Sequence, residues 1–183
     1  MRGVVAAVVG SLLVAGLSTL GDFVWSRFIP AHRPLFGLLH GTALCLAVGL
    51  FLGAGRRQPI RGALAGAGIG LGAAGGYYLL ARLMGYAAMF VLWMALWAAF
   101  GLLLGRGLGE PRSSTGEAIG RGMLAALGSG LAFYAISGIW TSPPPGGPDY
   151  AYHFLCWTIA FLPGFLALLA GPRGGNGVAA GIH

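Results

Sequence analysis

Long apolar runs separated by short polar breaks make up most of the chain. A helix needs about 20 consecutive apolar residues to cross the roughly 30 Å hydrocarbon core of a bilayer. Six runs meet that length, so we predict transmembrane helices at residues 4–24, 35–54, 62–84, 86–104, 122–140 and 150–170. They predict an all-α, polytopic bundle within residues 1–171, followed by a flexible, glycine-rich cytoplasmic tail at 172–183.

Composition favours a membrane protein over a soluble one. Hydrophobic residues make up 57% and charged residues 8% of the 183 positions, whereas soluble domains carry about 25% charged residues. The net charge of +7 comes from arginines that lie singly between apolar runs. Nucleic-acid-binding proteins instead gather their cations on one face, so we expect no nucleic-acid partner.

The arginines also predict the orientation of the chain in the membrane. Six spans put both termini on one side, and eight of the arginines fall on that side: Arg2, Arg56, Arg57, Arg61, Arg106, Arg112, Arg121 and Arg173. Only Arg27, Arg33 and Arg82 fall on the other side. Because arginine concentrates in cytoplasmic loops, we expect both termini in the cytoplasm.

The third predicted helix has glycines four residues apart in two series, at 62, 66 and 70 and at 68, 72 and 76. Small residues at this spacing let helix backbones approach closely in lipid. We therefore expect this helix at the centre of the bundle, and its glycine face could equally serve a homo-oligomer. The fourth helix contains Trp93 and Trp97 but no ionisable residue, which is typical of a lipid-facing or packing helix.

Ionisable side chains concentrate near the outer end of the predicted bundle. Asp22, Asp149 and His153 lie near that surface, and His40 lies about 7 Å deeper along its helix. His40 and His153 lie inside apolar runs, where an imidazole needs a partner or a cavity. We predict that His40 lines the outer half of a cavity in the bundle. A weak repeat between residues 10–26 and 128–142 brings both histidines to the same mouth.

Two chemical alternatives follow from the same residues. A metal site would require His32, His40, Asp149 and His153 to converge, but no two histidines are three or four positions apart, and we expect no metal and no cofactor. A small membrane transporter or enzyme would use Asp22, His40, Asp149 and His153 as proton-handling groups at the outer surface. Catalysis by Cys156 or Ser142 with His153 as base lacks oxyanion donors, so no catalytic residue is assigned.

Two segments resemble the Insig family. The first is HGTALCLAVGL at 40–50, and the second is YAISGIWTSPPPGGPDYAYHFLCWTIAFLPG at 134–164. The matching positions are Gly41, Thr42, Ala43, Val48, Gly49, Leu50, Tyr134, Thr141, Ser142, Pro143, Asp149, Tyr152 and Trp157. The chain departs from the family pattern in its prolines and glycines after Ser142 and in having His40 before Gly41.

The resemblance implies a non-catalytic six-helix protein whose membrane-facing cavity holds a sterol or another lipid. In animals the family partners sterol-sensing membrane proteins, whereas the lysine-free composition here is typical of a GC-rich bacterium. We therefore expect an inner-membrane protein that binds a diacylglycerol-like or sterol-like lipid from the bilayer. The residues expected at the lipid site are Trp25, His40, Thr42, Tyr78, Tyr134, Trp140 and His153.

Overall fold

The structure is a computed structural model, and it describes residues 1–28, 33–109, 114–136 and 149–170. Its elements are α1 (Arg2–Phe28), α2 (Arg33–Ala54), α3 (Pro59–Met84), α4 (Ala87–Leu102), the π-helical turn η1 (Leu103–Gly107), α5 (Thr115–Ile136) and α7 (Tyr150–Leu169). In this described part of the chain, six helices are long and apolar enough to span a membrane. The predicted all-α, six-helix membrane bundle is thus confirmed.

Helix boundaries differ from the prediction where polar residues begin a helix. α5 starts at Thr115, seven residues before the predicted position, because Ser114 and Glu117 form a capping box. The Ser114 hydroxyl accepts from the Glu117 N–H at 3.1 Å, and the Glu117 carboxylate accepts from the Ser114 N–H at 2.9 Å. α3 starts at Pro59, since proline is favoured in the first helical turn. The predicted end of the fifth span and the tail at 172–183 lie outside the described residues.

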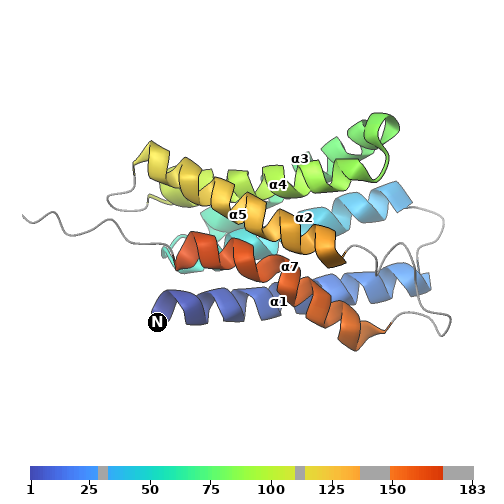
Figure 1. Cartoon of the computed structure of the whole chain (residues 1–183), viewed down its shortest axis with the longest axis horizontal. Coiled ribbons are helices and arrows are strands. Elements are labelled where there is room, and N and C mark those ends of the chain that lie inside the picture. The colour runs from blue at the N-terminus through green and yellow to red at the C-terminus, as the bar shows by residue number, and fades with distance from the viewer. Residues whose placement is uncertain (29–32, 110–113, 137–148, 171–183) are drawn as a thin grey trace, which may run out of the picture.

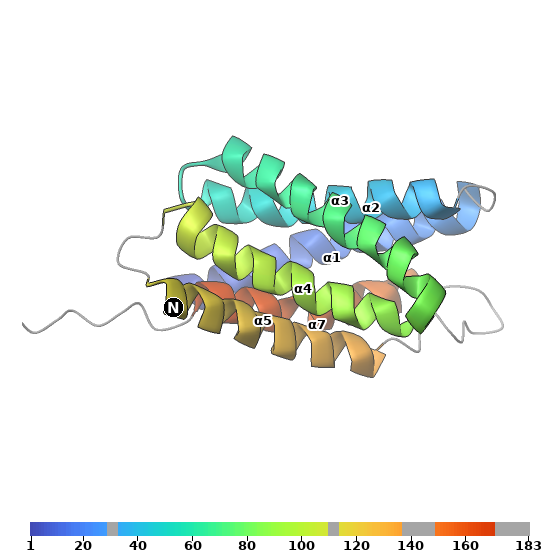
Figure 2. The same ribbon diagram turned by 90° about the horizontal axis from the view of Figure 1, so that it is seen from above.

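The helices run back and forth along one axis, and α1 lies antiparallel to α7 (Figures 1 and 2). Gly3 of α1 packs on the backbone of Leu169, whereas Asp22 meets His153 at the opposite end of the pair. The start of α1 and the end of α7 therefore share one end of the bundle. The described arginines segregate as predicted: Arg2, Arg56, Arg57, Arg61, Arg106 and Arg121 lie toward this end and Arg27, Arg33 and Arg82 toward the other.

α2 and α3 form a closely packed antiparallel pair. A Cβ atom added at Gly66 would overlap the carbonyl oxygen of Cys45, and one added at Gly49 would overlap that of Gly62. The glycine spacing thus predicted a real backbone contact. The expected central position of this helix is wrong, because α3 is the least buried of the six spans. It lies at the edge of the bundle, with Leu64 and Leu79 exposed.

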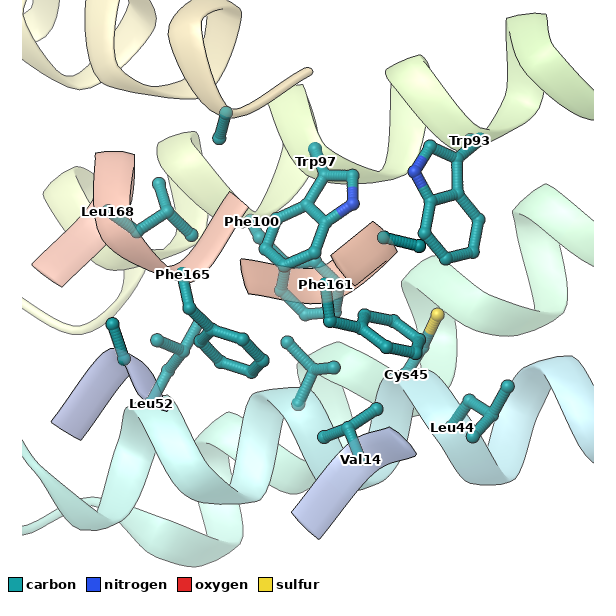
Figure 3. Close-up of a cluster of buried hydrophobic side chains, with 14 of the residues drawn as sticks. Val14, Leu44, Cys45, Leu52, Trp93, Trp97, Phe100, Phe161, Phe165 and Leu168 are labelled. Carbon is teal, nitrogen blue, oxygen red and sulfur yellow. The ribbon is translucent and has the colours of Figure 1, made fainter. Parts of the chain in front are cut away.

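Aromatic side chains of α4 and α7 fill the middle of the bundle. Trp97, Phe100 and Phe165 are fully buried, and Figure 3 shows their rings among side chains from α1 and α2. Gly164 leaves room for the Trp97 ring, which a Cβ atom at 164 would meet at 2.5 Å. Of the two roles considered for α4, packing rather than lipid exposure is therefore the one that the structure supports.

The hydroxyl group of Ser129 makes polar contacts within this apolar core. Ser129 of α5 accepts a hydrogen bond from the indole N–H of Trp93 at 2.8 Å and donates one to the carbonyl of Ala160 at 2.5 Å. Pro163 lies three residues after Ala160 in the same helix. Because proline has no N–H, the Ile159 carbonyl lacks its usual helical donor, and α7 bends in this region (Figure 1). The hydroxyl thereby joins α4, α5 and α7.

Candidate functional site

A cavity of about 590 Å³ lies within the bundle, and residues of all six helices line it. Along α2 its wall extends from Phe36 to Val48, which corresponds to about 18 Å at 1.5 Å per residue. The cavity therefore begins near the end of the bundle that is opposite most of the arginines and extends about two-thirds of the way along α2.

The deeper part of the cavity is apolar and largely aromatic. Trp93 stacks on Phe133 with ring centroids 4.5 Å apart, and Trp157 stacks on Phe161 at 5.6 Å. These four rings, together with aliphatic residues such as Leu96, form the wall of the inner half. Packed rings of this kind provide a rigid surface that fits a hydrocarbon body.

Polar side chains gather at the outer part of the wall, in contrast to the apolar depth. They are Asp22, His40, His153, Tyr77, Tyr78 and Tyr86, and we call them the polar rim. A site with a small polar end and a long apolar body matches the usual character of a small-molecule site, in which few polar groups fix the orientation of the bound molecule.

Asp22 is the centre of a hydrogen-bond network in the polar rim. Its Oδ2 atom accepts from the indole N–H of Trp157 at 2.7 Å and from Nδ1 of His153 at 3.0 Å. His153 and Trp157 lie four positions apart, so both side chains project from one face of α7. The network ties α1 to α7 and gives partners to two groups that would be costly to bury alone.

Two glycines make room for other polar side chains of the rim. A Cβ atom at Gly21 of α1 would overlap the imidazole of His40, whose ring stacks on Phe36 with centroids 5.6 Å apart. A Cβ atom at Gly37 of α2 would overlap the hydroxyl of Tyr78. Both side chains are therefore held on the cavity wall by close contact with a neighbouring backbone.

Asp149 has a structural role that the proton-handling alternative did not anticipate. Its carboxylate caps α7 and accepts from the backbone N–H groups of Ala151 at 3.0 Å and Tyr152 at 3.1 Å. It does not line the cavity. Of the four residues in that alternative, Asp22, His40 and His153 come together and Asp149 does not.

Three of the residues expected at the lipid site line the cavity: His40, Tyr78 and His153. Thr42 lies instead at the contact of α2 with α3, beside Gly70. Tyr134 is 67% exposed and packs edge-on against Phe90 outside the cavity, so the expectation that it lines the site is not met.

The side chain of Trp25 and all of Trp140 lie outside the described part of the chain.

Sequence reasoning did not assign Trp157 or Tyr86 to the site, although both line the cavity.

Cys45 lies on the cavity wall and Cys156 is buried away from it, and both thiols are free. Among the described residues, no group of three or more His, Cys, Asp or Glu is placed to hold a metal ion. His32, a member of the possible metal set, lies outside those residues.

Comparison with known proteins adds no family to this picture. No protein-family model, curated protein or solved structure matches the chain. The resemblance to the Insig family stays a prediction, and the function is argued from the cavity and its polar rim.

Proposed function

We propose that this integral membrane protein binds a lipid in the cavity and catalyses no reaction on it. The observation that carries the proposal is the cavity itself, because its volume of about 590 Å³ lies within the range of about 300–1,000 Å³ found for ligand sites. A diacylglycerol-like or sterol-like molecule has the matching form of one small polar group on a large apolar body.

The depth of the polar rim favours a lipid over a transported solute. His153 lies three residues from the start of α7, and His40 seven residues from the start of α2. At 1.5 Å per residue, both lie within about 10 Å of the helix ends, which is the depth of a lipid head rather than of the bilayer midplane. Secondary transporters place their sites near the midplane.

The resemblance to the Insig family supports the same proposal. Its two segments lie in α2 and at α5 to α7, and residues of all three helices line the cavity. The family pattern implies a membrane-facing cavity that holds a sterol or another lipid, which agrees with a site of this shape.

Native mass spectrometry of the gently purified protein tests the proposal. We expect a stoichiometric bound lipid, identified after organic extraction, in the wild type. Ala73→Trp should abolish this binding, because Ala73 lines the cavity and an indole there would occupy its volume. Leu71→Trp is the matched control, since Leu71 is exposed on the outside of the same helix and should leave the bound lipid unchanged.

A wild-type protein that carries no lipid, or an Ala73→Trp variant that retains as much lipid as Leu71→Trp, would remove the cavity as a lipid site.

We also propose an orientation, with both termini in the cytoplasm of a bacterial inner membrane. In intact cells a membrane-impermeant maleimide should label Arg82→Cys but not Thr115→Cys, because the two positions lie toward opposite ends of the bundle. The native Cys45 and Cys156 are both buried, so we expect little labelling of the protein without an added cysteine. Labelling of Thr115→Cys but not of Arg82→Cys would show the opposite orientation, with both termini outside the cytoplasm.

A further inference from the structure

Only one of the two oxygen atoms of the Asp22 carboxylate is used within the described chain. Trp157 and His153 both donate to Oδ2, and Oδ1 accepts no hydrogen bond from the residues that the structure describes. The side chain is 19% exposed, and it forms part of the cavity wall. A carboxylate oxygen at this depth is a strong acceptor that favours a donor from whatever occupies the cavity.

We propose that Oδ1 of Asp22 accepts a hydrogen bond from the free hydroxyl group of the bound lipid. The site then selects a neutral alcohol head over an alkylated or anionic head. This inference rests on the proposed lipid binding and adds the chemical class of the head. A diacylglycerol and a sterol both carry one such hydroxyl, so the shared chemistry is a single alcohol on an apolar body.

His153 and Trp157 act as positioning residues in this arrangement. Because both donate to Oδ2 from one face of α7, they hold the carboxylate in one orientation and leave Oδ1 for the cavity. The indole of Trp157 is in turn fixed by its stacking on Phe161.

The charges around the cavity oppose an anionic head. No arginine is among the described residues that line it, so a phosphate or a fatty-acid carboxylate would face Asp22 without a permanent counter-charge. The imidazole of His153 already makes a hydrogen bond to Oδ2 of Asp22. Two like charges at short range in a medium of low dielectric repel strongly.

A matched series of lipids tests the head directly on the full-length, delipidated protein. The probes are dioctanoylglycerol, its methyl ether on the free hydroxyl, and dioctanoyl phosphatidic acid, with cholesterol and its methyl ether as a sterol pair. Binding is measured by native mass spectrometry at several concentrations. In at least one of the two pairs, diacylglycerol or sterol, we expect the alcohol to bind at least about ten-fold more tightly than its methyl ether. The ether cannot donate the hydrogen bond to the carboxylate of Asp22. Phosphatidic acid should bind more weakly still.

Asp22→Asn should remove this selectivity. An amide presents only one acceptor oxygen, which its two partners on α7 would occupy, and its NH₂ group can donate to an ether as well as to an alcohol. The ratio of alcohol to ether affinity should fall close to one. Asp149→Asn is the control, since Asp149 caps α7 outside the cavity and asparagine is also a good cap. Its selectivity should equal that of the wild type.

The outcomes separate this inference from the proposed function. Equal binding of alcohol and ether by the wild type, tightest binding of phosphatidic acid, or retained selectivity in Asp22→Asn would overturn the role of Oδ1 while lipid binding stands. Failure of the wild type to bind any probe would overturn both. If Asp22→Asn does not fold, the wild-type series decides alone. A preference confined to the sterol pair would support the inference and identify a sterol-like ligand.

Discussion

The substitution Gly66→Ala should lower the free energy of unfolding by about 1–3 kcal/mol, the usual cost of overpacking. The new Cβ atom would overlap the Cys45 carbonyl and lie 3.0 Å from the Cα of Gly49, and both are backbone atoms of α2. No side-chain rotation relieves that overlap, so α2 and α3 must separate. Unfolding in increasing SDS, followed by circular dichroism, measures the loss.

Gly72→Ala on the same helix is the matched control and should have the opposite sign. Apart from the backbone of its own helical turn, no heavy atom lies within 4 Å of a Cβ atom at position 72, so the substitution meets no obstacle. Alanine also favours a helix over glycine by up to about 1 kcal/mol. Equal losses in both variants would mean that helix propensity or detergent contact, and not backbone packing of α2 on α3, governs the result.

The number of helices could be predicted from the sequence because each span must satisfy its own backbone in lipid. That requirement makes apolar length almost sufficient. The beginning of α5 could not be found this way, since the capping box of Ser114 and Glu117 lies outside the apolar run. The Ser-x-x-Glu spacing was the signal that would have placed it.

Glycine spacing predicted that α3 packs closely on a neighbouring helix, but neither which of its two glycine series makes the contact nor where the helix lies in the bundle. Gly62, Gly66 and Gly70 meet α2, whereas Gly68 and Gly72 of the other series have no neighbour within 4 Å. Side chains of α4 and α7 occupy the centre of the bundle, because large rings such as those of Trp97 and Phe165 bury more apolar surface than glycines do. A periodic pattern describes one helix and carries no information on the order of helices around the core.

The candidate site was predicted in part because polar residues inside apolar runs are few. His40 and His153 stood out for that reason, and both line the cavity. The bond between Asp22 and Trp157 spans 135 positions between the first and last helices, so no local spacing announces it. Tyr134 does not line the cavity, and an aromatic residue near a helix end can equally be an anchor at the membrane surface.

The substitution Ser129→Ala should cost about 1–2 kcal/mol of stability. It leaves both the indole N–H of Trp93 and the carbonyl of Ala160 without the hydroxyl that each now contacts. Water cannot replace that hydroxyl in a core where Ser129 itself is 0% exposed. The same SDS unfolding measures the effect, and Trp93→Phe should cost less in the Ser129→Ala background than in the wild type.

Ser18→Ala isolates the cause of that loss. Ser18 is also 0% exposed, but its hydroxyl has no hydrogen-bond partner among the described residues. Removing an unpaired buried hydroxyl should be neutral or stabilising. The two variants share the change in volume and helix propensity, so the difference between them reports the hydrogen bonds alone. Equal losses at positions 18 and 129 would show that packing, rather than the Ser129 bridge, joins α4, α5 and α7.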